Sequence, residues 1–288
     1  MKLKRILLII ISLFLIPVIC FSAEVTSGKK LPEYGWEKEL VSSLNLTQST
    51  FDHWIQGGEN TLAWQLNVNT RFENEQGNYN WANTGKIAYG KSKVGDAESR
   101  KTADEIKLET VLTYKLSLYV NPYVAFKGET QFTTGYAYTD TSKRAISDFF
   151  DPAYFTQSLG LGYSPGKEFK TRLGFALKET FTDNYPIPYA DDPDTPEIEK
   201  TKVEAGMDLV VEFKKKLAEN ILFSSKLDSF SNLKRFDTID VNWDNLFSAK
   251  VSKIISANYN FTLLYDKDLS KKRQIKQILA LTLTLSFL

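Results

Sequence analysis

Apolar and polar residues alternate with a period of two along most of this chain, and the last ten residues show the pattern most clearly. Leu279, Leu281, Leu283, Leu285 and Phe287 fall on one side of an extended segment, whereas Ala280, Thr282, Thr284 and Ser286 fall on the other. A period of two is that of a β-strand, in which successive side chains point to opposite faces. The pattern therefore predicts strands, with little helical signal anywhere after Trp36.

The alternation predicts twelve strands. They lie near residues 38–50, 61–73, 79–91, 104–118, 122–135, 153–164, 168–182, 201–214, 219–230, 239–252, 257–266 and 274–288. Each is about as long as, or slightly longer than, the roughly 9–11 residues that a tilted strand needs to cross a bilayer. The number is even, as in bacterial single-chain barrels. We therefore predict an all-β fold, a transmembrane antiparallel β-barrel of about 12 strands.

The predicted connections alternate in length, and this orients the barrel. Five are tight, at 75–78, 120–121, 164–167, 215–219 and 255–257. The others are longer and more polar, near 51–60, 92–103, 136–152, 183–200, 231–238 and 267–273. Outer-membrane barrels have short turns on the periplasmic side and long loops outside. Both termini are therefore expected in the periplasm.

Alternation alone leaves open which face points outward, because a soluble barrel or sandwich would bury the apolar set and expose the charges. The aromatic residues of the apolar set gather towards strand ends, at Phe72, Trp81, Tyr163, Phe169 and Phe213 near tight turns and at Tyr89, Phe132, Phe155, Phe181, Trp243 and Tyr265 near long loops. Aromatic rings prefer the two interfaces of a membrane. This distribution favours lipid outside and water inside over the soluble all-β alternative.

The N-terminus has the features of a secretion signal. Lys2, Lys4 and Arg5 precede an apolar run from Ile6 to Phe21, which is followed by the small residues Ser22 and Ala23. We predict a signal peptide at 1–22, a periplasmic lead at 23–37 and the barrel domain at 38–288. The expected location is the outer membrane of a Gram-negative-type bacterium.

Composition excludes several classes of function. Removing the three basic residues of the signal lowers Lys+Arg from 36 to 33, against 35 Asp+Glu, so the mature chain has no polybasic surface for nucleic acid. Its only cysteine, Cys20, lies in the signal, which excludes disulfides and thiolate metal sites. We expect no cofactor and no metal site. The acidic segment 189–197 lacks the ligand spacing of a calcium loop. The expected partners are outer-membrane lipids, lipopolysaccharide and the barrel-assembly machinery.

With the apolar set outward, charged residues of both signs face the lumen. The candidate lumen-lining residues are Arg71, Lys107, Glu109, Lys127, Glu129, Arg172, Lys202, Glu204, Asp208, Glu212, Asp240 and Asp244. Acidic residues dominate 202–250 and basic residues dominate 107–178. Two interpretations remain open. The charges pair into a lattice that fills the interior, or they line a polar conduit that selects solutes. Twelve strands lie between the roughly 8 of a filled barrel and the 16–18 of an open porin.

The mature chain has one histidine, His53, and it is the only candidate for a catalytic base. Asp52 and Glu59 could orient it, and Ser49 could act as a nucleophile, as in a surface hydrolase. Asp52, however, adjoins His53, and neighbouring strand residues point to opposite faces. We therefore predict no enzyme and no catalytic residue, and interpret this segment as a loop.

This loop also carries a family resemblance. The segment 44–48, followed by His53, Trp54, Gly57, Gly58 and Asn60, resembles the N-terminal signature of an uncharacterised outer-membrane barrel family, a domain of unknown function. That family shows an Asn-Trp-x-x-Gly-Gly-x-Asn motif, in which His53 here replaces the first Asn. The resemblance implies the location and the fold, and it implies no activity.

From these observations we expect an outer-membrane barrel that forms a narrow channel for small polar solutes. The alternatives are a non-conducting scaffold that acts through its surface loops and a hydrolase centred on His53.

Overall fold

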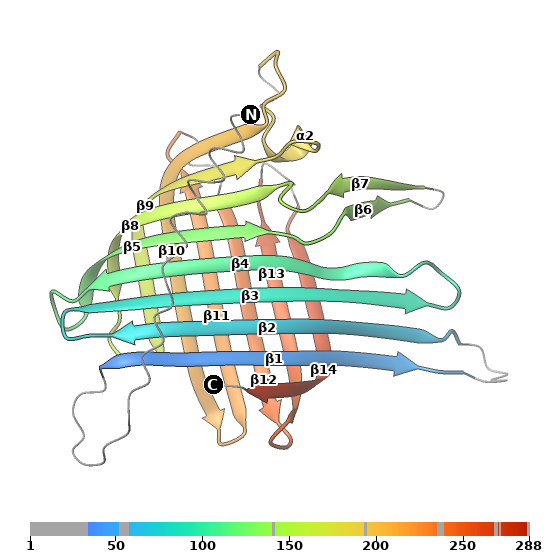
Figure 1. The fold of residues 1–288 in the computed structure, drawn as a ribbon, viewed down its shortest axis with the longest axis horizontal. Coiled ribbons are helices and arrows are strands. Elements are labelled where there is room, and N and C mark those ends of the chain that lie inside the picture. Colours follow the sequence, from blue (N-terminus) through green and yellow to red (C-terminus); the bar gives the residue numbers. More distant parts are fainter. Residues whose placement is uncertain are drawn as a thin grey trace. The chain divides into compact units, whose positions relative to one another are not determined.

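The computed structural model describes residues 34–51, 58–139, 142–192, 195–234, 239–267, 270 and 272–286. Within Tyr34–Leu288, twelve antiparallel strands close into one barrel (Figure 1). The strands are β1 (Gly35–Ser49), β2 (Thr61–Glu75), β3 (Tyr79–Val94), β4 (Arg100–Tyr114), β5 (Val120–Thr130), β8 (Ala153–Tyr163), β9 (Phe169–Phe181), β10 (Thr201–Ala218), β11 (Ile221–Asn232), β12 (Ile239–Lys250), β13 (Ile255–Tyr265) and β14 (Gln274–Ser286). The predicted fold of twelve strands is confirmed.

Each strand pairs with its neighbour in sequence, and β14 returns to pair with β1. A hydrogen-bonded chain crosses this closing seam, because Asn258 donates to Thr282 (3.0 Å) and Thr282 donates to Asn45 (2.8 Å). Thr282 is almost fully buried. Closure satisfies the backbone groups that a free edge would leave unpaired.

Three tight turns differ from prediction by a few residues, and side-chain hydrogen bonds explain two of the shifts. The turn between β10 and β11 lies at 219–220, because β10 continues through Lys215 and Lys216 to Ala218. The turn between β4 and β5 lies at 115–119, where Asn121 Oδ1 accepts the backbone N–H groups of Leu116 (2.7 Å) and Ser117 (2.9 Å). The turn between β12 and β13 lies at 251–254, where Ser252 Oγ accepts the N–H groups of Ile254 and Ile255. Such side-chain hydrogen bonds give the backbone an alternative to the sheet ladder, and the alternating pattern does not reveal them.

Two long connections also differ from expectation. The connection at 92–103 is shorter, because β3 continues to Val94 and β4 begins at Arg100. The connection at 136–152 contains a hairpin of its own, β6 (Gly135–Tyr138) and β7 (Lys143–Ser147), which lies outside the barrel sheet (Figure 1). A one-turn helix, α2 (Pro186–Tyr189), lies in the connection between β9 and β10.

Two aspartates hold the long connections to the barrel. Asp104 of β4 accepts the N–H groups of Phe132 (2.7 Å) and Thr133 (3.0 Å) at the start of the hairpin connection. Asp151 accepts hydrogen bonds from the backbone of Asp183 and Asn184 and from the hydroxyl of Thr182. These contacts order the rim of the barrel at the end where the long connections lie.

The outer face of the barrel is apolar along its strands. Strongly exposed side chains include Leu108 and Leu112 of β4, Val124 of β5, Leu159 and Leu161 of β8, Leu173 and Phe175 of β9, and Leu279, Leu281, Leu283 and Leu285 of β14. Leu279 is 76% exposed and Leu281 is 64% exposed. The charged ends of the intervening side chains lie on the opposite face, inside the barrel.

Candidate functional site

A chain of alternating charges crosses the inside of the barrel. It runs from Lys86 through Glu105, Lys107, Glu129, Lys127, Asp228, Lys226 and Glu109 to Arg172, with Glu212 attached to Lys226. We call these ten residues the charged lattice. It contains five bases and five acids, so its formal charge is zero. The residues come from β3, β4, β5, β9, β10 and β11.

Several contacts of the lattice join strands that are far apart in the barrel. Glu109 of β4 accepts from Arg172 of β9 through one oxygen and from Lys226 of β11 through the other (2.8 Å). Lys127 of β5 reaches Asp228 of β11 at 3.3 Å. Four strands separate β4 from β11 along the sheet, so in a barrel of twelve these side chains meet across the lumen. Lys127–Asp228 thus joins the region rich in bases to the region rich in acids, whereas Glu109–Lys226 joins an acid of the first region to a base of the second.

The remaining candidate residues take smaller roles. Lys178 bonds Asp240 at 2.6 Å, Lys202 pairs with Glu204 at 3.2 Å, and Arg71 pairs with Glu73. Asp208 is buried. It lies opposite Gly174 in the register.

A tyrosine fills the lumen beside the lattice by lying over two glycines. Tyr123 of β5, Gly160 of β8 and Gly174 of β9 are register neighbours on adjacent strands, and Tyr123 is 3% exposed. A Cβ at Gly174 would come within 2.7 Å of the Tyr123 hydroxyl and 2.3 Å of the Leu159 carbonyl oxygen. A Cβ at Gly160 would lie 2.2 Å from the carbonyl oxygen of Leu173. Only glycine leaves room for this packing.

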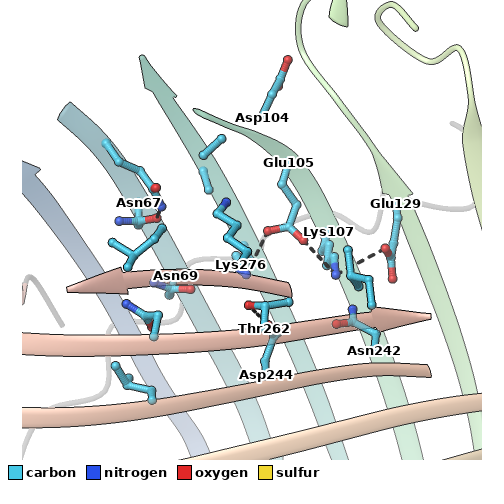
Figure 2. Close-up of a pocket in the computed structure, with 18 of the residues that line it drawn as sticks. Asn67, Asn69, Asp104, Glu105, Lys107, Glu129, Asn242, Asp244, Thr262 and Lys276 are labelled. Carbon is cyan, nitrogen blue, oxygen red and sulfur yellow. Dashed lines mark hydrogen bonds and ion pairs between the residues drawn. The ribbon is translucent and has the colours of Figure 1, made fainter. Parts of the chain in front are cut away.

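A polar cavity of about 690 Å³ lies next to the lattice, on the side nearer the long connections (Figure 2). Its walls combine lattice residues with amides and hydroxyls from β1, β2, β12 and β13, among them Asn45, Gln65, Asn67, Asn69, Asn242, Asn258, Asn260 and Thr262. Tyr154 and Tyr189 also line it. This volume lies within the range of about 300–1,000 Å³ that small-molecule sites occupy.

Sequence reasoning missed three charged residues at this cavity, Asp104, Glu105 and Lys276. Two of them carry a signal that could have found them, because Glu105 shares a strand face with Lys107 and Lys276 shares one with Ala280 and Thr282. The candidate Asp244 also lines the cavity, where its Oδ1 accepts from Thr262 (2.6 Å). Figure 2 shows Glu105 and Lys107 on one set of strands, facing the set that carries Asp244 and Thr262.

The motif loop is described in part. His53, Trp54 and Gly57 lie outside the described residues, as do the predicted signal peptide and Phe287. Gly58 has φ +148°, and the Phe51 ring packs where its side chain would be. Asn60 accepts the Phe51 N–H at 2.7 Å. Gly58 and Asn60 therefore shape the loop between β1 and β2.

The described part of the chain contains no group of three or more His, Cys, Asp or Glu that could hold a metal ion. None of its helices has the length and apolar character needed to cross a membrane.

Comparison with known proteins gives one family match. A family described as a protein of unknown function (DUF3078) matches residues 46–136, from the end of β1 into β6. No curated protein matches the sequence.

Solved structures match this chain only at low identity. The translocator domain of the autotransporter NalP from Neisseria meningitidis is 9% identical, with 90% of each chain covered and a TM-score of 0.40. An outer membrane channel from Pseudomonas putida F1 is 12% identical, with 92% of this chain and 100% of that chain covered and a TM-score of 0.40. The NanC porin is 7% identical, with 86% and 97% covered and a TM-score of 0.38. At these scores the comparison assigns no activity to this chain.

Proposed function

We propose that this protein is an outer-membrane barrel that forms a narrow channel for small polar solutes. The observation that carries the proposal is the polar cavity inside a closed barrel whose outer face is apolar. The proposal joins two separate claims, that lipid surrounds the strands and that solutes pass through the lumen.

The outer face supports the first claim. Side chains such as Phe175, Leu279 and Leu281 are more than half exposed, and comparable residues lie on most strands. Monomeric soluble proteins rarely expose contiguous apolar patches larger than a few hundred Å². Rings pair on this face near the strand ends, as Trp36 does with Trp81 and Trp64 with Tyr89. Such rings suit the headgroup level of a bilayer.

The interior supports the second claim and limits the size of the solute. The cavity is lined mainly by charged, amide and hydroxyl side chains, which suit water and polar solutes. The charged lattice then narrows the lumen, because Glu109 and Lys127 bond partners on the far wall. A pathway past this lattice suits small solutes and excludes large ones.

Planar-bilayer recording of the detergent-solubilised protein tests the function. We expect small unitary currents in KCl, and larger ones for the double variant Lys127→Ala with Asp228→Ala, which removes one crossing pair at no change in net charge. The matched control, Glu98→Ala with Lys143→Ala, removes an exposed ion pair in the loops and should conduct as the wild type does. Absence of current from both the wild type and the widened variant would reject the channel and favour the scaffold.

A further inference from the structure

Two charged residues of the cavity stand apart from the charged lattice. Asp244 of β12 and Lys276 of β14 both line the cavity. Among the described residues, neither has an oppositely charged group within 4.0 Å. The lattice lysines Lys86, Lys107 and Lys226, by contrast, each contact at least one carboxylate.

The two residues lie in one row across the sheet. Asp244 pairs in register with Thr262 of β13, and Thr262 pairs with Lys276. The three side chains therefore share the inner face, and the backbones of Asp244 and Lys276 are about 10 Å apart, two strand spacings. Thr262 fills the middle of the row and donates to Asp244 Oδ1, which leaves Oδ2 free to accept.

We propose, building on the channel function, that this row binds a small zwitterion, with its ammonium group on Asp244 and its carboxylate on Lys276. Asp244 is half-buried and Lys276 is exposed, so water compensates both charges when no solute is bound. The lattice residues already have protein partners, whereas Asp244 and Lys276 offer one acceptor and one donor of opposite sign. Their backbones, about 10 Å apart, leave room for a short solute with an ammonium group at one end and a carboxylate at the other, such as an amino acid or a dipeptide.

The rest of the cavity fits a neutral solute body. Asn258 and Asn260 precede Thr262 on the same face of β13, and Asn67 and Asn69 line the cavity from β2. Amide groups both donate and accept hydrogen bonds, so they can hold a peptide group without adding charge.

Calorimetric titration with glycylglycine tests the site in the folded, detergent-solubilised protein. We expect saturable binding to the wild type. For Asp244→Asn and for Lys276→Gln the dissociation constant should rise by roughly ten- to a hundredfold, because each variant loses one hydrogen bond to a charged group and the free energy of such a bond corresponds to about this factor. The loop variant Lys143→Gln is the matched control and should bind as the wild type does. Heat-modifiable migration on gels checks that each variant is folded.

Blocked dipeptides distinguish the two ends of the site. N-acetylglycylglycine has only the carboxylate, so Asp244→Asn should leave its binding unchanged while Lys276→Gln abolishes it. Glycylglycine amide has only the ammonium group and should show the reverse. Absence of saturable glycylglycine binding, or binding by either variant as tight as that of the wild type, would overturn the inference. Because titration needs no current, a protein that conducts without binding refutes the site alone, and one that binds without conducting refutes the channel alone.

Discussion

Removing the charge of Glu109 should destabilise the barrel and change its ion selectivity together. The Glu109 carboxylate compensates two cations, Arg172 of β9 and Lys226 of β11, and its side chain is 12% exposed. The substitution Glu109→Gln keeps the shape and removes the charge. The lattice then changes from a formal charge of zero to +1.

The magnitude follows from the contacts. A hydrogen bond to a charged group contributes about 1.5–3 kcal/mol, so loss of both would cost about 3–6 kcal/mol. Glutamine keeps one acceptor, and Lys226 retains Glu212 at 3.6 Å and Asp228 at 3.9 Å. Lys226 is also about one-third exposed to the lumen, where water screens it. We therefore expect a loss of about 2–4 kcal/mol in the free energy of unfolding.

Two assays check this reasoning. Urea unfolding of the protein in lipid vesicles should show a lower midpoint with an unchanged slope, because the surface exposed on unfolding is the same. The reversal potential in a KCl gradient should move towards anion selectivity. Glu98→Gln, which removes an exposed loop carboxylate, should unfold at the wild-type urea midpoint. If Glu109→Gln unfolds and conducts as the wild type does, the lattice neither supports the barrel nor lies on its pathway.

Three further predictions concern other parts of the molecule. Leu281→Arg on the outer face should cost about 2–4 kcal/mol in a bilayer, measured by urea unfolding in vesicles, whereas an unchanged or higher stability would indicate that water surrounds this face. Gly174→Ala should cost about 1–3 kcal/mol because its Cβ would meet backbone, and a folded protein of wild-type stability would contradict the Tyr123 packing. At Asp151, burial raises the pKa of the carboxyl, but hydrogen bonds from Thr182, Asn184 and Asp183 outweigh it and hold that pKa below its usual value. The rim contact is therefore stable above the usual aspartate pKa and lost as pH falls through the lowered one. Amide hydrogen exchange at Asp183 and Asn184 should accelerate only when the pH falls below the lowered pKa of Asp151. The variant Asp151→Asn should expose both amides at neutral pH.

The sequence predicts the strands well because each strand shows the period-two alternation within its own residues. In a closed barrel every strand has one apolar and one polar face, so period two recurs locally, as in β10 and β14. Turn positions are less predictable. At 115–119 the apolar alternation continues through Leu116 and Leu118. The strand nevertheless ends at Tyr114, because Asn121 Oδ1 accepts the backbone N–H of Leu116 in the turn. The β6–β7 hairpin escaped prediction because its strands have only four and five residues.

The interior was predictable by composition but not by pairing. Strand parity identifies Glu109, Lys127 and Asp228 as inner residues, and nothing in the sequence says that they meet. Their contacts depend on which strands lie opposite each other across the lumen, and this is a property of the closed sheet. The same holds for the Tyr123 packing, which needs glycines at register positions on two other strands.

Among the described residues, the interior thus contains two kinds of charged region, the paired charges of the lattice and the unpaired row from Asp244 to Lys276. Together the two regions favour one class of solute. Along the lattice each charge is compensated by the protein, so an entering ion gains little there and must displace an existing partner. At the row from Asp244 to Lys276, a cation alone would compensate only Asp244 and an anion alone only Lys276. A zwitterion compensates both and adds no net charge to a lattice that is already neutral. Selectivity would then depend on the separation of the two charges in the solute, which the register of β12, β13 and β14 sets.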